Sequence, residues 1–86
     1  MEIRIGTVTH YFNRISVAVL KLSGELKVGD KILLLGRTTD FTQVVTSMEI
    51  EHRKVPAVGP GMEVALKVAD SVRSGDEVYK VVASEQ

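Results

Sequence analysis

Few side chains in this sequence have the types and spacing that catalysis requires. A nucleophilic triad needs a Ser or Cys beside a His that a third group orients. The chain has no cysteine and two histidines, His10 and His52, while Ser16 and Ser47 are candidates by residue type alone. We therefore expect no catalytic residues, and we expect that the chain is not an enzyme in its own right.

One local cluster, Glu49-x-Glu51-His52, has the residue types of a metal site. Successive side chains of a β-strand point to opposite faces, so the two glutamates would share a face and His52 would oppose them. A metal ion needs about three or four convergent ligands. The segment Gly59-Pro60-Gly61 is not a phosphate-binding loop, because Pro60 has no N–H and no helix follows. The sequence predicts neither a metal ion nor a cofactor, and it does not favour a small-molecule substrate.

Binding is the better-supported class of function. Two aromatic residues lie side by side in the segment His10-Tyr11-Phe12-Asn13-Arg14, and Arg37 lies in a second polar loop. Aromatic rings beside arginine suit stacking on bases or packing against a protein partner. We expect these residues to form a binding platform. The alternative is that Tyr11 or Phe12 fills one end of a small β-barrel.

A second candidate group consists of Glu49, Arg53 and Lys54. These residues either contribute to a binding surface or form the solvated end of a strand, with Glu49 paired to one of the two cations. Exposed ion pairs contribute only about 0–1 kcal/mol to stability. The substitution Glu49→Gln should therefore leave stability nearly unchanged.

The composition is that of one small globular domain spanning residues 1–86. Hydrophobic residues make up 44% of the chain, and the 11 basic residues balance the 11 acidic ones. Zero net charge argues against a strong nonspecific grip on nucleic acid, and it leaves a local basic patch open. No apolar run approaches the ~18 residues of a membrane span, and the N-terminus does not read as a signal peptide. The sequence predicts a cytoplasmic protein that does not bind membranes, and it leaves the oligomeric state open.

Short strands between turn signals must position the candidate residues. Strands are predicted over residues 1–8, 15–22, 32–35, 41–52, 62–69 and 77–82. The second strand is apolar on both faces, which is typical of a strand covered on both sides or one that crosses a barrel. The fold class that follows is all-β, a small six-stranded antiparallel Greek-key-like barrel.

Glycines mark the turns and one irregularity of this predicted fold. Gly29-Asp30 and Gly75-Asp76 indicate two copies of one tight turn, since Gly accepts φ > 0 and Asp can bond its own backbone. Gly6 indicates either a β-bulge that repairs the register of the first strand or a place where a neighbour packs too closely for a side chain.

Four segments resemble the second domain of the elongation factor Tu type translation GTPases. They are Leu26–Ile32, Ser47–Lys54, Ala57–Leu66 and Val72–Val78. They match that domain's hydrophobic-Lys-Val-Gly-Asp/Glu turn, its charged strand end, its Gly-x-x-Gly turn and its last Gly-Asp/Gln turn. The resemblance implies a barrel of the translation-factor domain II type. It also places Glu49 in register with an acidic residue that helps form the pocket for the terminal adenosine of aminoacyl-tRNA.

A closer resemblance is to the C-terminal barrel domain of the collagenase-like peptidase family. It rests on the segments Gly6–Asn13, Gly36–Phe41 and Ser47–His52. In that family the barrel follows a larger catalytic domain, so the resemblance does not imply peptidase activity for this chain.

We therefore predict a non-enzymatic binding module of translation-factor type that binds RNA, tRNA or an RNA-handling protein. The alternative is a detached accessory C-terminal domain that docks on a separately encoded catalytic subunit of the collagenase-like peptidase family. Zero net charge favours protein docking. The set of Arg14, Arg37, Arg53 and Lys54 favours RNA if these side chains share a face.

Overall fold

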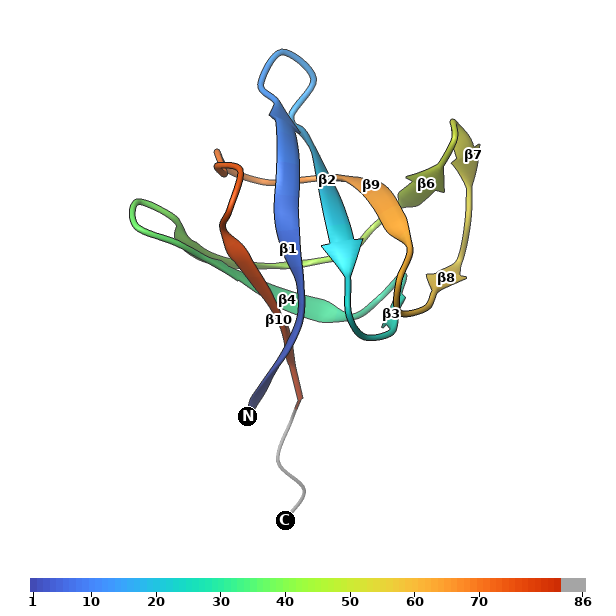
Figure 1. Ribbon diagram of the computed structural model, residues 1–86, viewed down its shortest axis with the longest axis horizontal. Coiled ribbons are helices and arrows are strands. Elements are labelled where there is room, and N and C mark those ends of the chain that lie inside the picture. Colours follow the sequence, from blue (N-terminus) through green and yellow to red (C-terminus); the bar gives the residue numbers. More distant parts are fainter. Residues whose placement is uncertain (83–86) are drawn as a thin grey trace.

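The computed structural model describes residues 1–82, and all regular structure in this part of the chain is β-strand (Figure 1). No helix of residues 1–82 is long and apolar enough to cross a membrane. The strands, in chain order, are β1 (Glu2–Phe12), β2 (Val17–Leu22), β3 (Leu26–Lys27), β4 (Lys31–Leu35), β5 (Asp40–Val44), β6 (Met48–Ile50), β7 (Arg53–Lys54), β8 (Ala57–Val58), β9 (Glu63–Lys67) and β10 (Glu77–Val81).

The larger sheet confirms the predicted all-β antiparallel class. Eight strands of the described residues pair in the order β5-β4-β10-β1-β2-β9-β6-β7, and β3 pairs with β8 in a small second sheet. The predicted closure into a six-stranded barrel was wrong. After β5 the chain crosses over to pair β6 with β9 and then turns back as β7, so β5 and β7 remain the two ends of the sheet.

The predicted strand over residues 41–52 is divided for the same reason. Residues 45–47 are not in a strand, and β5 and β6 pair with different neighbours on either side of them. Val44 and Met48 were predicted to share the inner face. Instead Val44 is 51% exposed and Val45 is buried, because the backbone changes partner at this point.

The side chain of Gln43 connects β5, at one edge of the larger sheet, to the end of β9. Its Nε2 donates to the carbonyl oxygen of Lys67 at 2.8 Å, and its Oε1 accepts from the N–H of Ala69 at 2.7 Å. The Gln43 amide thus resembles a backbone peptide group of a β-ladder, which also donates one hydrogen bond and accepts another. The sheet therefore curls until β5 approaches the end of β9, and one side-chain amide bridges these two strands, which no backbone ladder joins.

Two irregularities bend β1. Its register shifts against β10 between Arg4 and Gly6, and against β2 between Val8 and His10. Gly6 fills both predicted roles, because the first shift lies beside it and a Cβ at this position would lie 2.6 Å from the carbonyl oxygen of Lys21. The backbones of β1 and β2 therefore come too close there for any side chain.

The two Gly-Asp turns form as predicted. Gly29 and Gly75 both have φ of 98°, a conformation that glycine adopts at little cost. The Oδ2 atoms of Asp30 and Asp76 each accept a hydrogen bond from the backbone N–H three residues earlier, at 2.9 and 2.8 Å. The same four-residue device thus precedes β4 and β10.

Each turn docks on a buried valine of another segment. The first turn exchanges two backbone hydrogen bonds with Val45, and the second does so with Val8. In each case the valine carbonyl accepts from the glycine N–H, at 2.8 and 2.7 Å, and the valine N–H donates to the aspartate carbonyl, at 2.9 and 2.8 Å. The turns therefore tie together parts of the chain that are distant in sequence.

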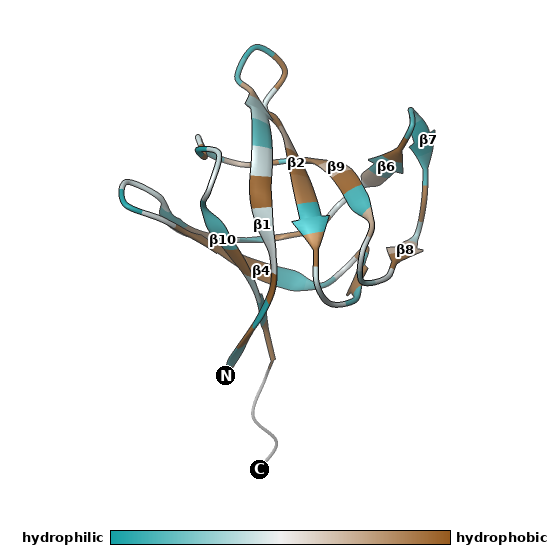
Figure 2. Ribbon diagram, viewed as in Figure 1, coloured by the Kyte–Doolittle hydropathy of each residue, from teal (hydrophilic) through white to brown (hydrophobic). Residues whose placement is uncertain are grey.

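One aliphatic core fills the inner side of the curled sheet. Hydrophobic and hydrophilic residues alternate along the strands that enclose it (Figure 2). Fully burying an aliphatic side chain is worth about 1.5–3 kcal/mol. The largest fully buried side chains are Leu20, Leu22, Leu26, Ile32, Leu34, Met48, Val8, Val45, Val64 and Val78.

Thr39 and Asp76 are buried polar residues that fasten the β4–β5 connection to the second Gly-Asp turn. The Thr39 hydroxyl donates to Oδ2 of Asp76. Gly36 passes directly against this carboxylate, and a Cβ there would lie 1.9 Å from Oδ1 of Asp76. The side chain of Asp76 therefore occupies the space that any other residue at position 36 would need.

Candidate functional site

His10, Tyr11 and Phe12 of the predicted platform lie within β1 itself, and their side chains are divided between its two faces. His10 and Phe12 are exposed on the outer face, and their rings stack with centroids 6.3 Å apart and planes 10° apart. Tyr11 is half-buried and packs against the core, so the alternative role as a filling residue holds for this side chain. Asn13 and Arg14 are exposed at the tip of the hairpin.

An open groove lies along the outer faces of β2 and β9, between the β1–β2 hairpin and β6. Three adjoining hollows in the described residues share Glu49 and Ala65. We call this the β2–β9 groove. The most apolar of its hollows has a volume of about 430 Å³ and is lined by Phe12, Ile15, Val17, Val19, Glu49, Glu51, His52 and Ala65.

The apolar lining of this groove comes from strand alternation. On β2 the side chains of Ala18, Leu20 and Leu22 are buried in the core, so those of Val17 and Val19 point outward and remain half-exposed. Within residues 1–82 the outer face of β2 is half-exposed and the sheet is not closed, so β2 is neither a strand covered on both sides nor one that crosses a barrel, the two predicted alternatives. Ala65 on β9 is small, and it leaves the floor of the groove open.

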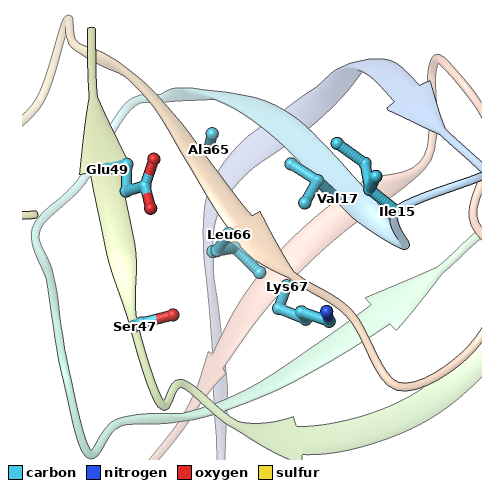
Figure 3. Close-up of a pocket in the computed structure, with 7 residues that line it drawn as sticks. All are labelled: Ile15, Val17, Ser47, Glu49, Ala65, Leu66 and Lys67. Carbon is cyan, nitrogen blue, oxygen red and sulfur yellow. The ribbon is translucent and has the colours of Figure 1, made fainter. Parts of the chain in front are cut away.

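Glu49 places a carboxylate at this apolar surface. Figure 3 shows its side chain on β6 directed over Ala65, with Val17 and Ile15 on the far side. Glu49 is half-buried, and Lys54 lies opposite it in the β6–β7 ladder. The ion pairs formed within residues 1–82 are Arg4–Glu77 and Lys80–Asp30. The expected pairing of Glu49 with Arg53 or Lys54 is therefore not formed there.

The hairpin turn between β6 and β7 brings Glu51 and His52 to the rim of the groove. Both have positive φ, 51° and 66°, as the two central residues of a two-residue hairpin turn require. Positive φ angles are uncommon for residues other than glycine, and they cluster at active sites and ligand-binding sites. Among residues 1–82 no group of three or more His, Cys, Asp or Glu is arranged to hold a metal ion.

The predicted basic residues do not meet on one surface. Arg14 lies in the β1–β2 connection, Arg37 in the β4–β5 connection, and Arg53 and Lys54 form β7. These three hairpins point to different sides of the molecule (Figure 1). Strong binding to nucleic acid depends on clustered positive charge, so this arrangement does not favour RNA.

Sequence reasoning identified Phe12 and Glu49 but missed most of the groove that they border. The missed residues are Ile15, Val17, Val19, Glu51, His52 and Ala65. The available signal was the apolar character of both faces of residues 15–22, since one of two apolar faces on a small sheet has to lie outside.

Comparisons with known proteins identify the kind of protein that carries this fold. No family model matches the sequence. An uncharacterized protease of Methanocaldococcus jannaschii is 42% identical over 79 residues, which cover 91% of this chain and 19% of that protein. A collagenase of Porphyromonas gingivalis is 33% identical over 81 residues, which cover 92% of this chain and 20% of the collagenase. The chain therefore spans about a fifth of the length of these curated relatives.

A solved structure has the same fold over nearly the whole chain. It is the C-terminal domain of a Geobacillus thermoleovorans protein assigned to the U32 peptidases, with a TM-score of 0.86, 22% identity and 91% of each chain covered. The protein is thus a homologue of one segment of collagenase-type proteases. Its fold is that of a U32 peptidase C-terminal domain.

These findings bear differently on the two resemblances seen in the sequence. The resemblance to the C-terminal domain of the collagenase-like peptidase family is confirmed. The comparisons do not show the resemblance to elongation factor Tu, and they do not support RNA binding.

Proposed function

We propose that this chain is a non-catalytic accessory domain that docks on a collagenase-type catalytic region. The observation that carries the proposal is how much of each similar protein this chain covers. The chain matches an isolated C-terminal domain over 91% of both chains, but it matches only 19–20% of whole proteases. Most of a protease of this type therefore lies outside the part that this chain resembles.

The surface of the domain supports a docking role. The β2–β9 groove is open, and one of its three hollows is lined largely by apolar side chains. Contiguous apolar surface on a small soluble domain marks an interaction site more often than isolated exposed residues do.

Binding calorimetry with two purified proteins tests this function. The chain is titrated into the catalytic region of the collagenase-type protease of its source organism, prepared without the segment that this chain matches. We expect saturable binding with a Kd of about 10 μM or tighter, as for protein–protein interfaces of small to standard size. Absence of heat and of co-elution at high concentration would overturn the docking function.

A gelatin-cleavage assay tests the non-catalytic part of the proposal. The chain alone should release no peptides, and the catalytic region should remain the source of any cleavage when the two are mixed. Cleavage by the highly purified chain alone would contradict the proposal.

A further inference from the structure

Building on the proposed function, we infer that the β2–β9 groove is the docking surface. Its occupant is a segment of the catalytic region that carries one Lys or Arg between aliphatic side chains. Three observations lead to this assignment: the continuity of the apolar lining, the charges within it, and the identity of the polypeptide available to cover it.

The apolar lining is continuous rather than scattered. Phe12 is 49% exposed and Ile15 is 58% exposed at one end, and the half-exposed Val17 and Val19 extend the surface along β2. Single exposed apolar residues are ordinary, whereas a contiguous set beside a hollow is informative. The small side chain of Ala65 leaves room for an inserted aliphatic group.

The charges in the groove specify the partner further. Glu49 lies in all three hollows, and Glu51 lines two of them. Lys67 lies in the hollow at one end, while Lys21 at the other end lies opposite Glu63 in the β2–β9 ladder. The centre is therefore acidic, one end is basic, and the other end carries both charges. A partner that covers Glu49 removes water from a carboxylate, which is costly unless a cation or donor replaces that water. A basic side chain at the centre of the partner segment meets this requirement.

A second copy of this chain fits the groove poorly. A twofold interface places the same patch on both partners, so the acidic centre of one copy would face the acidic centre of the other. Juxtaposed like charges oppose association. The relatives, in contrast, contain a further four-fifths of polypeptide beyond the part that this chain matches, which supplies the catalytic region as occupant.

Variants in and outside the groove test the assignment. The binding of Ile15→Asp and Glu49→Lys to the catalytic region is compared with that of the wild-type chain by calorimetry. Val44→Asp is the matched control, because Val44 is 51% exposed on β5 and does not line the groove. Circular dichroism and thermal melts establish that each variant is folded, and Glu49→Gln provides a milder second change at the same site.

We expect Ile15→Asp and Glu49→Lys to weaken binding by more than about tenfold, as for central interface residues. Glu49→Gln should weaken binding less than Glu49→Lys, and Val44→Asp should bind as the wild type does. Wild-type binding with unchanged affinity in both groove variants would overturn the groove while leaving the proposed function intact. Absence of wild-type binding would remove the proposed function together with the groove. Concentration-dependent self-association that Ile15→Asp abolishes would overturn the choice of occupant.

Discussion

Asp30 and Asp76 hold equivalent positions in two copies of one turn, but only Asp76 is buried. Each carboxylate accepts from the N–H three residues earlier, and each turn docks on a buried valine. Asp30 is partly buried, with its side chain 18% exposed, and its Oδ2 is 3.5 Å from Nζ of Lys80. Asp76 is 6% exposed and also accepts from the Thr39 hydroxyl. The same local geometry should therefore contribute differently to the free energy of unfolding at the two sites.

Replacing each aspartate by alanine should show how much each one contributes to the free energy of unfolding. Asp76→Ala leaves the buried hydroxyl of Thr39 and the partly buried N–H of Arg73 without their acceptor, and we expect it to lower the free energy of unfolding by about 2–3 kcal/mol. Asp30→Ala should cost about 1 kcal/mol, because water can replace much of what is lost. Urea denaturation of both variants measures the difference, and equal losses would contradict this account.

Gly36→Ala should destabilise the protein through Asp76. The new Cβ would lie 1.9 Å from Oδ1, so the carboxylate must move and give up its hydrogen bonds. We expect a loss of about 2 kcal/mol or more in chemical denaturation. Gly59→Ala is the control, because no atom beyond its two chain neighbours lies within 4 Å of a Cβ placed there. A Gly36→Ala protein as stable as the Gly59→Ala protein would refute the steric argument.

Gln43→Ala should loosen the contact between β5 and the end of β9. The substitution removes both bonds of the amide, and we expect it to cost about 1 kcal/mol. The sharper measurement is amide hydrogen exchange, since the N–H of Ala69 loses its acceptor and should exchange faster. Thr42→Ala, at an exposed neighbouring position of β5, should leave that amide unchanged. Unaltered protection of Ala69 in the Gln43→Ala protein would show that the bridge is absent in solution.

The turn residues Glu51 and His52 offer a stabilising substitution. Both have positive φ, and Asn-Gly is the preferred pair for a two-residue hairpin turn of this kind. The double substitution Glu51→Asn with His52→Gly should raise stability by about 1 kcal/mol and increase Tm. A lower Tm would mean that the two side chains stabilise the hairpin by contacts of their own.

Glu49→Gln should change the free energy of unfolding by less than about 0.5 kcal/mol. Glu49 has no ion pair within residues 1–82, and the isosteric amide keeps the shape of the side chain. Thermal and urea melts give the value. A loss of several kcal/mol would assign Glu49 a structural role and remove it from the docking surface.

The features that the sequence predicted well are those that local chemistry encodes. Gly29 and Gly75 mark their turns because positive φ selects glycine, and Gly6 marks a close approach because only hydrogen fits beside Lys21. The division of residues 41–52 was not predictable in this way. Val44, Val45 and Met48 are all apolar, and which of them faces inward depends on partner strands elsewhere in the chain.

The groove shows the same limit. Phe12 and Glu49 are far apart in the sequence, and they border one hollow only because β1 pairs with β2, β2 with β9, and β9 with β6. No local pattern encodes these three pairings together. Tyr11, in contrast, received its inward direction from the register shift at Val8–His10, which the residue types alone do not reveal.

The hydrogen bonds between each Gly-Asp turn and its distant valine also constrain how this chain folds. The turn before β4 needs Val45, and the turn before β10 needs Val8, which lies in the first strand. The first strand also pairs with the last, so it stays incomplete until nearly all of the chain described here has been synthesised. Such long loop closures slow folding, because ordering entropy is lost before the contacts form. During synthesis β1 would therefore precede the other strands described here and be among the last of them to acquire its full set of partners.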